Sequence, residues 1–201
     1  MKKLIAIFMV LGLVSCKTNK INNENISFLN EFRTIKLDTL KYIDVDYFAK
    51  ENIVKKLKSE YNNLYPTNYL LSQSIETPIE AIVKFKLDKN NWGLIIKGRG
   101  EKKINTCNFL LYNKKLKKIT SFLEILNSTK TDEYYFLKKG TIFKPDSNNI
   151  IGTYSYESIF LDDKNNIYKD FYIIKLLPTE INIVKLSGKE LKNYQRFFEN
   201  K

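Results

Sequence analysis

Apolar and polar residues alternate over most of the C-terminal part of the chain. Val83, Phe85 and Leu87 are separated by Lys84 and Lys86, which is the period-two pattern of a strand with one buried face. Similar stretches recur, each bounded by polar residues, and they predict a run of antiparallel strands. Further strands are expected at 92–96, 107–112, 119–126, 133–137, 141–143, 150–161, 167–177 and 180–186.

Short polar segments mark the turns between these strands. The tetrapeptide Asp-Lys-Asn-Asn at 88–91 separates two apolar runs, which is a hairpin signal. The same tetrapeptide recurs at 163–166, but its flanks match poorly, so we interpret it as one turn used twice rather than as a duplication. The trio Gly-Arg-Gly at 98–100 is interpreted as a turn with a glycine at positive φ, not as a phosphate-binding loop.

Helical spacing is seen at the two ends of this body. Phe28, Phe32 and Ile35 recur at three- and four-residue intervals, and residues 50–60 are rich in good helix formers. Residues 189–198 carry a similar apolar stripe. The sequence therefore predicts a helical N-terminal region and a short C-terminal helix.

The composition is that of a packed domain. The chain is 43% hydrophobic and 13% aromatic, and its 13 Tyr and 13 Phe residues favour strands. No linker rich in Pro or Gly divides residues 26–201, so we expect a single globular domain there. The predicted fold class is α+β, mainly β: an antiparallel meander, arranged as a sheet, sandwich or barrel, with the helical elements described above.

The start of the chain has the pattern of an export signal. Two lysines follow Met1, and an unbroken apolar run covers Leu4–Val14. This run is too short to cross a hydrocarbon core as a helix, which takes about 20 residues. A basic start followed by a short apolar run is typical of a secretory signal. The run ends in Leu13-Val14-Ser15-Cys16, which resembles the lipobox of bacterial lipoproteins.

The resemblance implies that residues 1–15 are a signal peptide and that Cys16 carries a diacylglycerol after cleavage. Two or three acyl chains would hold the protein at a membrane, because each buried methylene contributes ~0.8 kcal/mol. Residues 16–25 are then the lipidated cysteine and a polar, flexible tether. The alternative is an ordinary secretory signal with a chance cysteine. Residues 26–201 resemble no domain family.

The expected location is therefore the bacterial cell envelope, with a lipid anchor in a membrane. The first acidic residue after the cysteine is Glu24, which favours an anchor facing the periplasm rather than the cell surface. The formal net charge of +12 suggests contact with anionic lipid or another polyanion, or simply a lysine-rich composition. Nucleic acid is not the expected partner, because the chain has only three arginines.

Residue types that most enzymes need are missing or scattered. The absence of histidine excludes Ser-His-Asp triads and His-based zinc sites. Three acids, Glu133, Glu157 and Asp170, lie on or near predicted strands, but no spacing pairs them for hydrolysis. The acidic turn at 162–166 lacks the glycine and glutamate of a calcium-binding EF-hand loop. We therefore assign no catalytic, cofactor-binding or metal-binding residue and no cofactor.

Tyrosines on the later strands are the candidate interaction residues. Tyr154 and Tyr156 share one face of a predicted strand, and so do Tyr168 and Tyr172. Tyrosine is favoured at interfaces because it combines a rigid apolar area with a polar tip, although strand packing explains the same pattern. Nearby strands add Tyr134, Tyr135 and Phe136 to the aromatic set.

Two further residues are singled out by their surroundings. Thr39 follows Asp38 and precedes Leu40, which matches a short O-glycosylation pattern of exported proteins in some Gram-negative lineages. Cys107 has no partner within the chain if Cys16 is lipidated, and its apolar neighbours predict a small buried side chain.

These observations favour a lipid-anchored envelope protein that is not an enzyme and that binds another envelope protein or envelope component. Three alternatives stay open. They are a carrier or sensor of a small apolar ligand with a β-barrel cavity, a toxin-immunity lipoprotein, and a carboxylate-based hydrolase.

Overall fold

A computed structural model describes residues 27–37, 43–44, 55–66, 79–99, 105–130, 134–145, 148–160 and 167–198. The predicted signal peptide, Cys16 and the tether lie outside these residues, as do Thr39 and the turn at 163–166. No helix in the described ranges is long and apolar enough to span a bilayer.

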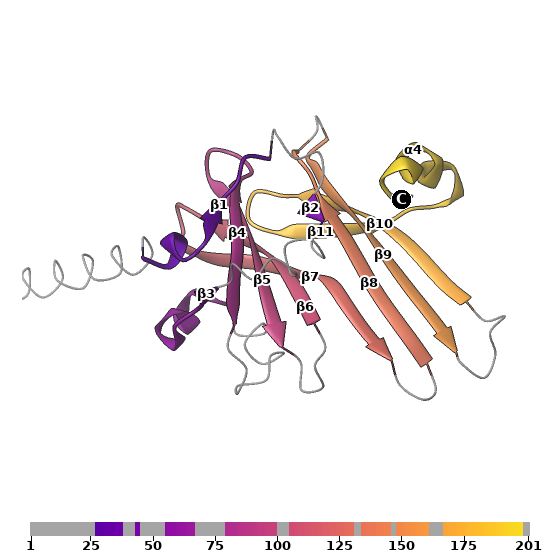
Figure 1. Cartoon of the computed structure of the whole chain (residues 1–201). Coiled ribbons are helices and arrows are strands. Elements are labelled where there is room, and N and C mark those ends of the chain that lie inside the picture. Colours follow the sequence, from indigo (N-terminus) through magenta and orange to yellow (C-terminus); the bar gives the residue numbers. More distant parts are fainter. Residues whose placement is uncertain are drawn as a thin grey trace, which may run out of the picture.

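A single mainly antiparallel sheet dominates the protein (Figure 1). Each strand from β4 to β11 pairs with the one before it, which confirms the predicted mainly-β antiparallel meander. The eight strands are β4 (Glu80–Lys86), β5 (Asn91–Arg99), β6 (Asn105–Asn113), β7 (Lys118–Lys130), β8 (Tyr134–Ile142), β9 (Ile150–Phe160), β10 (Ile167–Leu176) and β11 (Ile181–Lys185).

Short elements complete the fold at the edges of the sheet. Strand β1 (Arg33–Thr34) lies parallel to β4, β3 (Lys55–Lys56) lies antiparallel to β4, and β2 (Ile43–Asp44) pairs with β8. The helical elements are a turn at 27–30, the 3-10 helix η1 (Ser59–Leu64) and α4 (Gly188–Phe198). Helix α4 confirms the predicted C-terminal helix.

The N-terminal region is only partly helical. The helix formers at 50–60 predict a helix, but Lys55–Lys56 forms β3, where Lys55 pairs with Ala81. The pairing supplies backbone hydrogen bonds that the edge of β4 would otherwise lack, and such tertiary contacts routinely override helix propensity. A helical conformation occurs instead in the turn at 27–30 and in η1.

Two strand predictions need correction. The strands expected at 133–137 and 141–143 are one continuous strand, β8. The turn expected at 98–100 is wrong for its first two residues, because Gly98 and Arg99 lie within β5 opposite Thr106 and Asn105. Their ladder partners hold them in extended backbone, and Gly98 does not adopt positive φ.

Strand β7 connects two halves of the sheet, and these halves are displaced relative to each other along the direction of β7. Its first part, Lys118–Leu126, pairs with β6, and its last part, Leu126–Lys130, pairs with β8. Within the described pairing, Leu126 is therefore the residue of β7 that faces a partner on both sides. As a consequence, the far ends of β8, β9 and β10 extend past β4–β6, as Figure 1 shows at its lower right.

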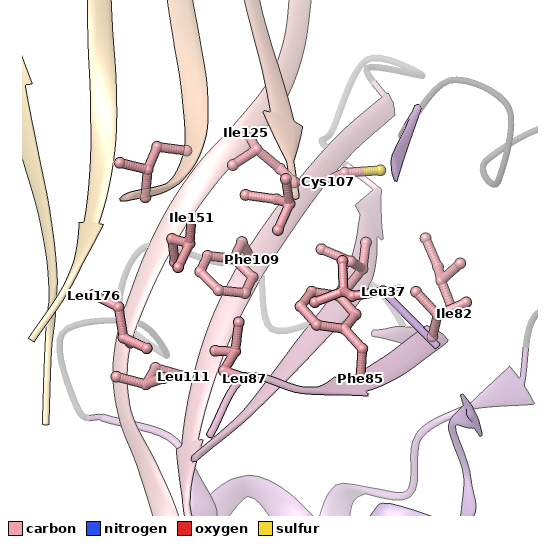
Figure 2. Close-up of a cluster of buried hydrophobic side chains, with 14 of the residues drawn as sticks. Leu37, Ile82, Phe85, Leu87, Cys107, Phe109, Leu111, Ile125, Ile151 and Leu176 are labelled. Atoms are coloured by element: carbon pink, nitrogen blue, oxygen red, sulfur yellow. The ribbon is translucent and has the colours of Figure 1, made fainter. Parts of the chain in front are cut away.

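A central core fills the curve of the sheet (Figure 2). It joins side chains from β4 at one end of the sheet to β10 near the other, so the sheet wraps around it. Phe85 and Phe109 stack with ring centroids 6.1 Å apart, and their rings lie over Gly93. Fully buried members include Phe85, Ile95, Cys107, Phe109, Leu111, Ile125, Ile142, Ile151 and Ile174.

The opposite face of β4–β6 is covered by the N-terminal segment. Phe28 is fully buried, and its ring lies edge-on to Tyr61 with centroids 5.2 Å apart. Lys84 lies on this face, donates to the backbone oxygen of Leu29, and is only partly exposed. The strands β4–β6 are thus covered on both sides, which explains why apolar residues occupy both faces of β5 and β6.

Helix α4 covers the corresponding face of β9–β11. Its Leu191 and Tyr194 pack against a cluster built on Ile150, Ile173 and Leu186. The helix starts with a capping arrangement in which the Ser187 backbone N–H and hydroxyl both donate to Glu190 Oε2.

A buried polar cluster ties three turns together at one end of the sheet. Asp88 accepts hydrogen bonds from the backbone N–H of Asn90 and Asn91, which forms the β4–β5 turn. In the β6–β7 turn, Asn113 Oδ1 likewise accepts a hydrogen bond from the backbone N–H of Lys115. Its Nδ2 donates to Asn91 Oδ1 at 3.0 Å. Both asparagines also donate to the backbone oxygen of Pro178 in the β10–β11 turn.

Candidate interaction surface

The four tyrosines singled out from the sequence lie on one face of the sheet. Tyr154 on β9 stands opposite Tyr172 on β10 in the strand register. Tyr156 and Tyr168 lie two and four residues away from these on the same strands, so they point to the same side. The sequence grouped these residues only within each strand, and the register brings the two pairs together.

Strand β8 adds two more aromatic rings to this face. Phe136 contacts Tyr156 edge-on, with ring centroids 5.0 Å apart, and Tyr134 lies two residues before it. Tyr135 points to the opposite face, because it is offset by one residue. We call the set Tyr134, Phe136, Tyr154, Tyr156, Tyr168 and Tyr172 the aromatic face.

The aromatic face begins in the central core and extends to side chains that are exposed to solvent. Tyr154 belongs to the core and is 7% exposed, whereas Tyr168, nearer the far end of β10, is 59% exposed. The offset along β7 explains this change, because β4–β6 do not extend far enough to cover the inner side of the far ends of β8–β10. Large aromatic side chains at the far ends of these strands are therefore exposed, on the same face as the buried ring of Tyr154.

Two ion pairs flank the aromatic face. On one side, Lys138 Nζ lies 2.7 Å from Glu124 Oε1 and 5.4 Å from the centroid of the Phe136 ring. On the other side, Lys185 Nζ lies 2.7 Å from Asp170 Oδ1. Each pair is only partly buried, so it can exchange its partner for a charge on another molecule at little cost.

Two hydroxyls of the aromatic face, those of Tyr154 and Tyr172, are held in the neutral form. Burial is the main cause that raises the pKa of Tyr154, and the nearby carboxylate of Glu124 adds to the effect. Burial also raises the pKa of Tyr172, whose hydroxyl donates to Asp170 Oδ2 at 3.2 Å. The hydrogen bond and charge of Lys185 lower the pKa of Asp170. At neutral pH the two hydroxyls therefore offer hydrogen bonds, and Asp170 balances the charge of Lys185.

The most exposed apolar side chains beside this face lie at the edge of the sheet. Ile167 and Tyr168 on β10 are 55% and 59% exposed, and Ile183 on β11 is 41% exposed. The ladder between β10 and β9 starts at Ile167, but that between β10 and β11 starts only at Tyr172. In the described residues, no strand covers the outer side of β10 before that point.

The backbone of this edge points outward at alternate residues. Leu186 N–H donates to the backbone oxygen of Phe171 at 2.8 Å, so Phe171 directs its backbone groups away from β9. By the alternation of an antiparallel ladder, Lys169 and Ile167 do the same. Their outward N–H and C=O groups form the type of edge to which an extended chain can pair.

The acids considered for hydrolysis are not brought together. Glu157 pairs with Lys169 on one face of the sheet, at 3.3 Å between Oε2 and Nζ. Asp170 lies on the other face, and Glu133 is outside the described residues. Among the residues that the structure describes, no group of three or more Cys, Asp or Glu residues is placed to hold a metal ion.

Cys107 is fully buried in the central core, as its neighbours in the sequence predict. It packs among aliphatic and aromatic side chains and acts as a small apolar residue.

No protein-family model matches the chain, and neither the curated proteins nor the solved structures contain a match to it.

The sequence missed the flanking charges as members of the surface. Phe136 was part of the wider aromatic set, and its alternation with Tyr134 and Lys138 signals that these three residues share a face. Lys185 could not be placed next to Asp170 in the same way, because the contact depends on the register between β10 and β11.

Proposed function

We propose that the protein is a lipid-anchored component of the bacterial cell envelope that binds another envelope protein through the aromatic face. The observation that carries the proposal is the gathering of aromatic side chains on one side of the sheet, from buried Tyr154 to exposed Tyr168. The lipobox-like tetrapeptide ending at Cys16 supports the location.

The chemistry of the face suits a protein partner. Aromatic residues on a rigid base make a large contact area with little loss of side-chain entropy, and they dominate protein interfaces. Lys138 and Lys185 supply charges at the rim, where electrostatics contribute to specificity and association rate. The open edge of β10 beside Tyr168 adds backbone groups that an extended segment of the partner can pair with.

Pairing with a second copy of the chain through this edge is less favourable. Two β10 edges related by antiparallel pairing about Lys169 would place the two Lys169 side chains directly opposite each other. Like charges at opposed positions destabilise a ladder. An acidic or apolar segment of a different protein meets no such penalty, and it complements the positive charge of this chain.

The filled central core favours this function over transport of a small apolar ligand. Such carriers enclose the ligand in a cavity lined by apolar side chains. Here Phe85 and Phe109 stack inside the curve of the sheet, and the core side chains around them are almost fully buried (Figure 2).

Metabolic labelling tests the anchor. The full chain is expressed in a bacterium supplied with an alkyne-bearing fatty acid, and the membrane fraction is collected. We expect labelled protein in that fraction, and loss of both the label and the membrane association in Cys16→Ser. An unlabelled wild-type chain, released freely from the membrane, would contradict the anchor.

A pair of neighbouring substitutions tests the aromatic face. Tyr168→Ser and Ile167→Ser remove side chains of similar exposure that point to opposite faces of the same strand. Affinity capture from solubilised envelopes, with quantification by mass spectrometry, should recover a specific protein with the wild type and with Ile167→Ser. Tyr168→Ser should recover at least about fivefold less, because interface tyrosines commonly contribute more than 1 kcal/mol. Equal recovery with all three chains would contradict the proposal.

A further inference from the structure

The β6–β7 turn places an exposed leucine among lysines. Residues 114–118 read Lys-Lys-Leu-Lys-Lys, and every side chain in this segment is exposed. Leu116 is 51% exposed, which puts it among the most exposed large apolar residues of the described chain. Exposed apolar side chains ringed by cationic residues are characteristic of segments that rest on anionic membrane surfaces.

The turn is held in a fixed shape that keeps Leu116 outward. Asn113 Oδ1 accepts hydrogen bonds from the backbone N–H of Lys115 and Leu116, each at 3.0 Å. Asn113 is itself buried and bound to Asn91 and Pro178, and Lys117 adopts a positive φ of 53°. The leucine therefore does not fold back onto the sheet, where an apolar residue would ordinarily be buried.

Neighbouring turns extend the positive charge. The N–H of Lys114 donates to the backbone oxygen of Asn90, so the β4–β5 turn with exposed Lys89 lies directly beside this segment. Lys114 Nζ lies 4.9 Å from the centroid of the Trp92 ring. Among the described residues, these turns carry two carboxylates: Asp88 is engaged by backbone N–H groups of its own turn, and Glu180 lies exposed in the β10–β11 turn. Lysines outnumber them, so the end of the sheet stays cationic.

The same end of the sheet receives the N-terminal segment. The ring of Phe28 lies 6.2 Å from that of Tyr112, which is separated from the turn by Asn113 alone. Figure 1 shows the violet N-terminal elements beside the start of β7. A chain held to a bilayer through residues before 27 therefore has this turn on the side of the domain at which the N-terminal segment packs.

We infer that the turn at 114–118 docks on an anionic lipid surface, with Leu116 entering the headgroup region and the lysines contacting lipid phosphates. This contact orients the body on the membrane. Strand β7 has 13 residues and starts at this turn, so its far end lies up to about 40 Å away at ~3.3 Å per residue. The aromatic face is then directed away from the bilayer. The lipid contact itself does not depend on the proposal that the aromatic face binds a protein.

A fluorescent probe at the turn tests the contact directly. The full chain carries a genetically encoded dansyl amino acid in place of Leu116 and is added to vesicles of phosphatidylcholine alone or mixed with phosphatidylglycerol. We expect a blue shift of the dansyl emission, and quenching by brominated acyl chains, only in vesicles with phosphatidylglycerol. The same probe in place of Gln195 on α4, which is also exposed, should show neither change. Because the probe reports its own surroundings, the result is independent of how the N-terminus is attached.

Two charge-matched variants separate the turn from the overall charge. Lys115→Glu with Lys118→Glu should abolish the shift at position 116, since each basic residue near an anionic surface strengthens binding and the loss should be about tenfold or more. Lys189→Glu with Lys192→Glu on α4 changes the net charge equally and should leave the shift intact. All four lysines are exposed, and circular dichroism checks that each variant is folded.

Three results would overturn the inference. One is a probe at position 116 that responds equally in neutral and anionic vesicles, or in neither. Another is an equal loss of signal in the two charge-matched variants, which would assign the attraction to net charge. The third is a spectral change caused by soluble polyphosphate but not by vesicles, which would assign the turn to a different polyanion.

Discussion

Asn113 Nδ2 donates to Asn91 Oδ1 at 3.0 Å, and both side chains are almost fully buried where three turns meet. This hydrogen bond links the start of β5 to the end of β6. Each asparagine side chain also donates to the backbone oxygen of Pro178, which lies much later in the chain, in the β10–β11 turn. Burial of amide groups is costly unless their hydrogen bonds are made, so this cluster stabilises one arrangement of the turns over others.

Replacement of Asn113 by alanine should destabilise the protein by about 2–3 kcal/mol. The substitution leaves Asn91 Oδ1 buried without this donor and removes the acceptor for the backbone N–H of Lys115 and Leu116. Urea denaturation followed by circular dichroism measures the change. Asn182→Ala on the exposed surface of β11 should stay within about 0.5 kcal/mol of the wild type. Equal stability of Asn113→Ala and the wild type would show that the cluster contributes nothing.

Gly93 is required by the packing of two rings. A Cβ at this position would lie 2.2 Å from Cε2 of Phe85 and 2.8 Å from Cε2 of Phe109. Both rings are fully buried and cannot move without disturbing the central core. Gly93→Ala should therefore cost about 1–3 kcal/mol through overpacking, as measured by thermal or urea unfolding.

The matched control for that substitution is Gly188, the first residue of α4. A Cβ there meets nothing within 4 Å, and the position does not have positive φ. Gly188→Ala should leave stability unchanged or raise it by up to about 1 kcal/mol, because alanine is the better helix former. A larger loss in Gly188→Ala than in Gly93→Ala would contradict the packing explanation.

The sheet could be predicted from the sequence because its signals are local. The alternation of Val83, Phe85 and Leu87 identifies β4 and its inner face, and the turn at 88–91 sets the reversal into β5. The start of the C-terminal helix is also marked locally, since Ser187 and Glu190 form the capping arrangement at its first turn.

Contacts between distant segments could not be predicted in this way. Lys84 has the pattern of a solvent-facing residue, yet the N-terminal segment covers it and its amine bonds to Leu29. Burial lowers the pKa of Lys84 for the same reason. The offset along β7, which exposes Tyr168 and buries Tyr154, depends on which half of the strand each neighbour pairs with. Period-two patterns show the two sides of a strand, but they do not show what covers either side.

The ion pair of Asp170 and Lys185 should give the stability a specific acid dependence. The hydrogen bond from Lys185 lowers the pKa of Asp170 in the folded protein. Since the folded pKa is below the unfolded one, the carboxylate stabilises the fold above the unfolded pKa, and this contribution is lost as the pH falls through the folded pKa. Asp170→Asn should therefore flatten the decline of stability below about pH 4.

Unfolding in urea across a series of acidic pH values measures this dependence. Lys185→Gln should shift the NMR titration of the Asp170 carboxyl upward, because the main cause of the lowered pKa is removed. Glu180→Gln, which alters an exposed acid in the β10–β11 turn, is the control with the same change in charge as Asp170→Asn. A titration of Asp170 that does not move in Lys185→Gln would contradict the assignment of this pair.

The N-terminal segment should be an integral part of the domain. Phe28 is fully buried and its ring contacts those of Phe32, Tyr61, Tyr65 and Tyr112, with centroids 5.2 to 6.2 Å apart. Phe28→Ala should cost about 3–5 kcal/mol, because the cavity is bordered by aromatic rings that cannot collapse into it. Leu116→Ala, at a side chain that is 51% exposed, should change stability by no more than about 0.5 kcal/mol. If Phe28→Ala unfolds at the same urea concentration as the wild type, the segment only rests on β4–β6 and does not contribute to the core.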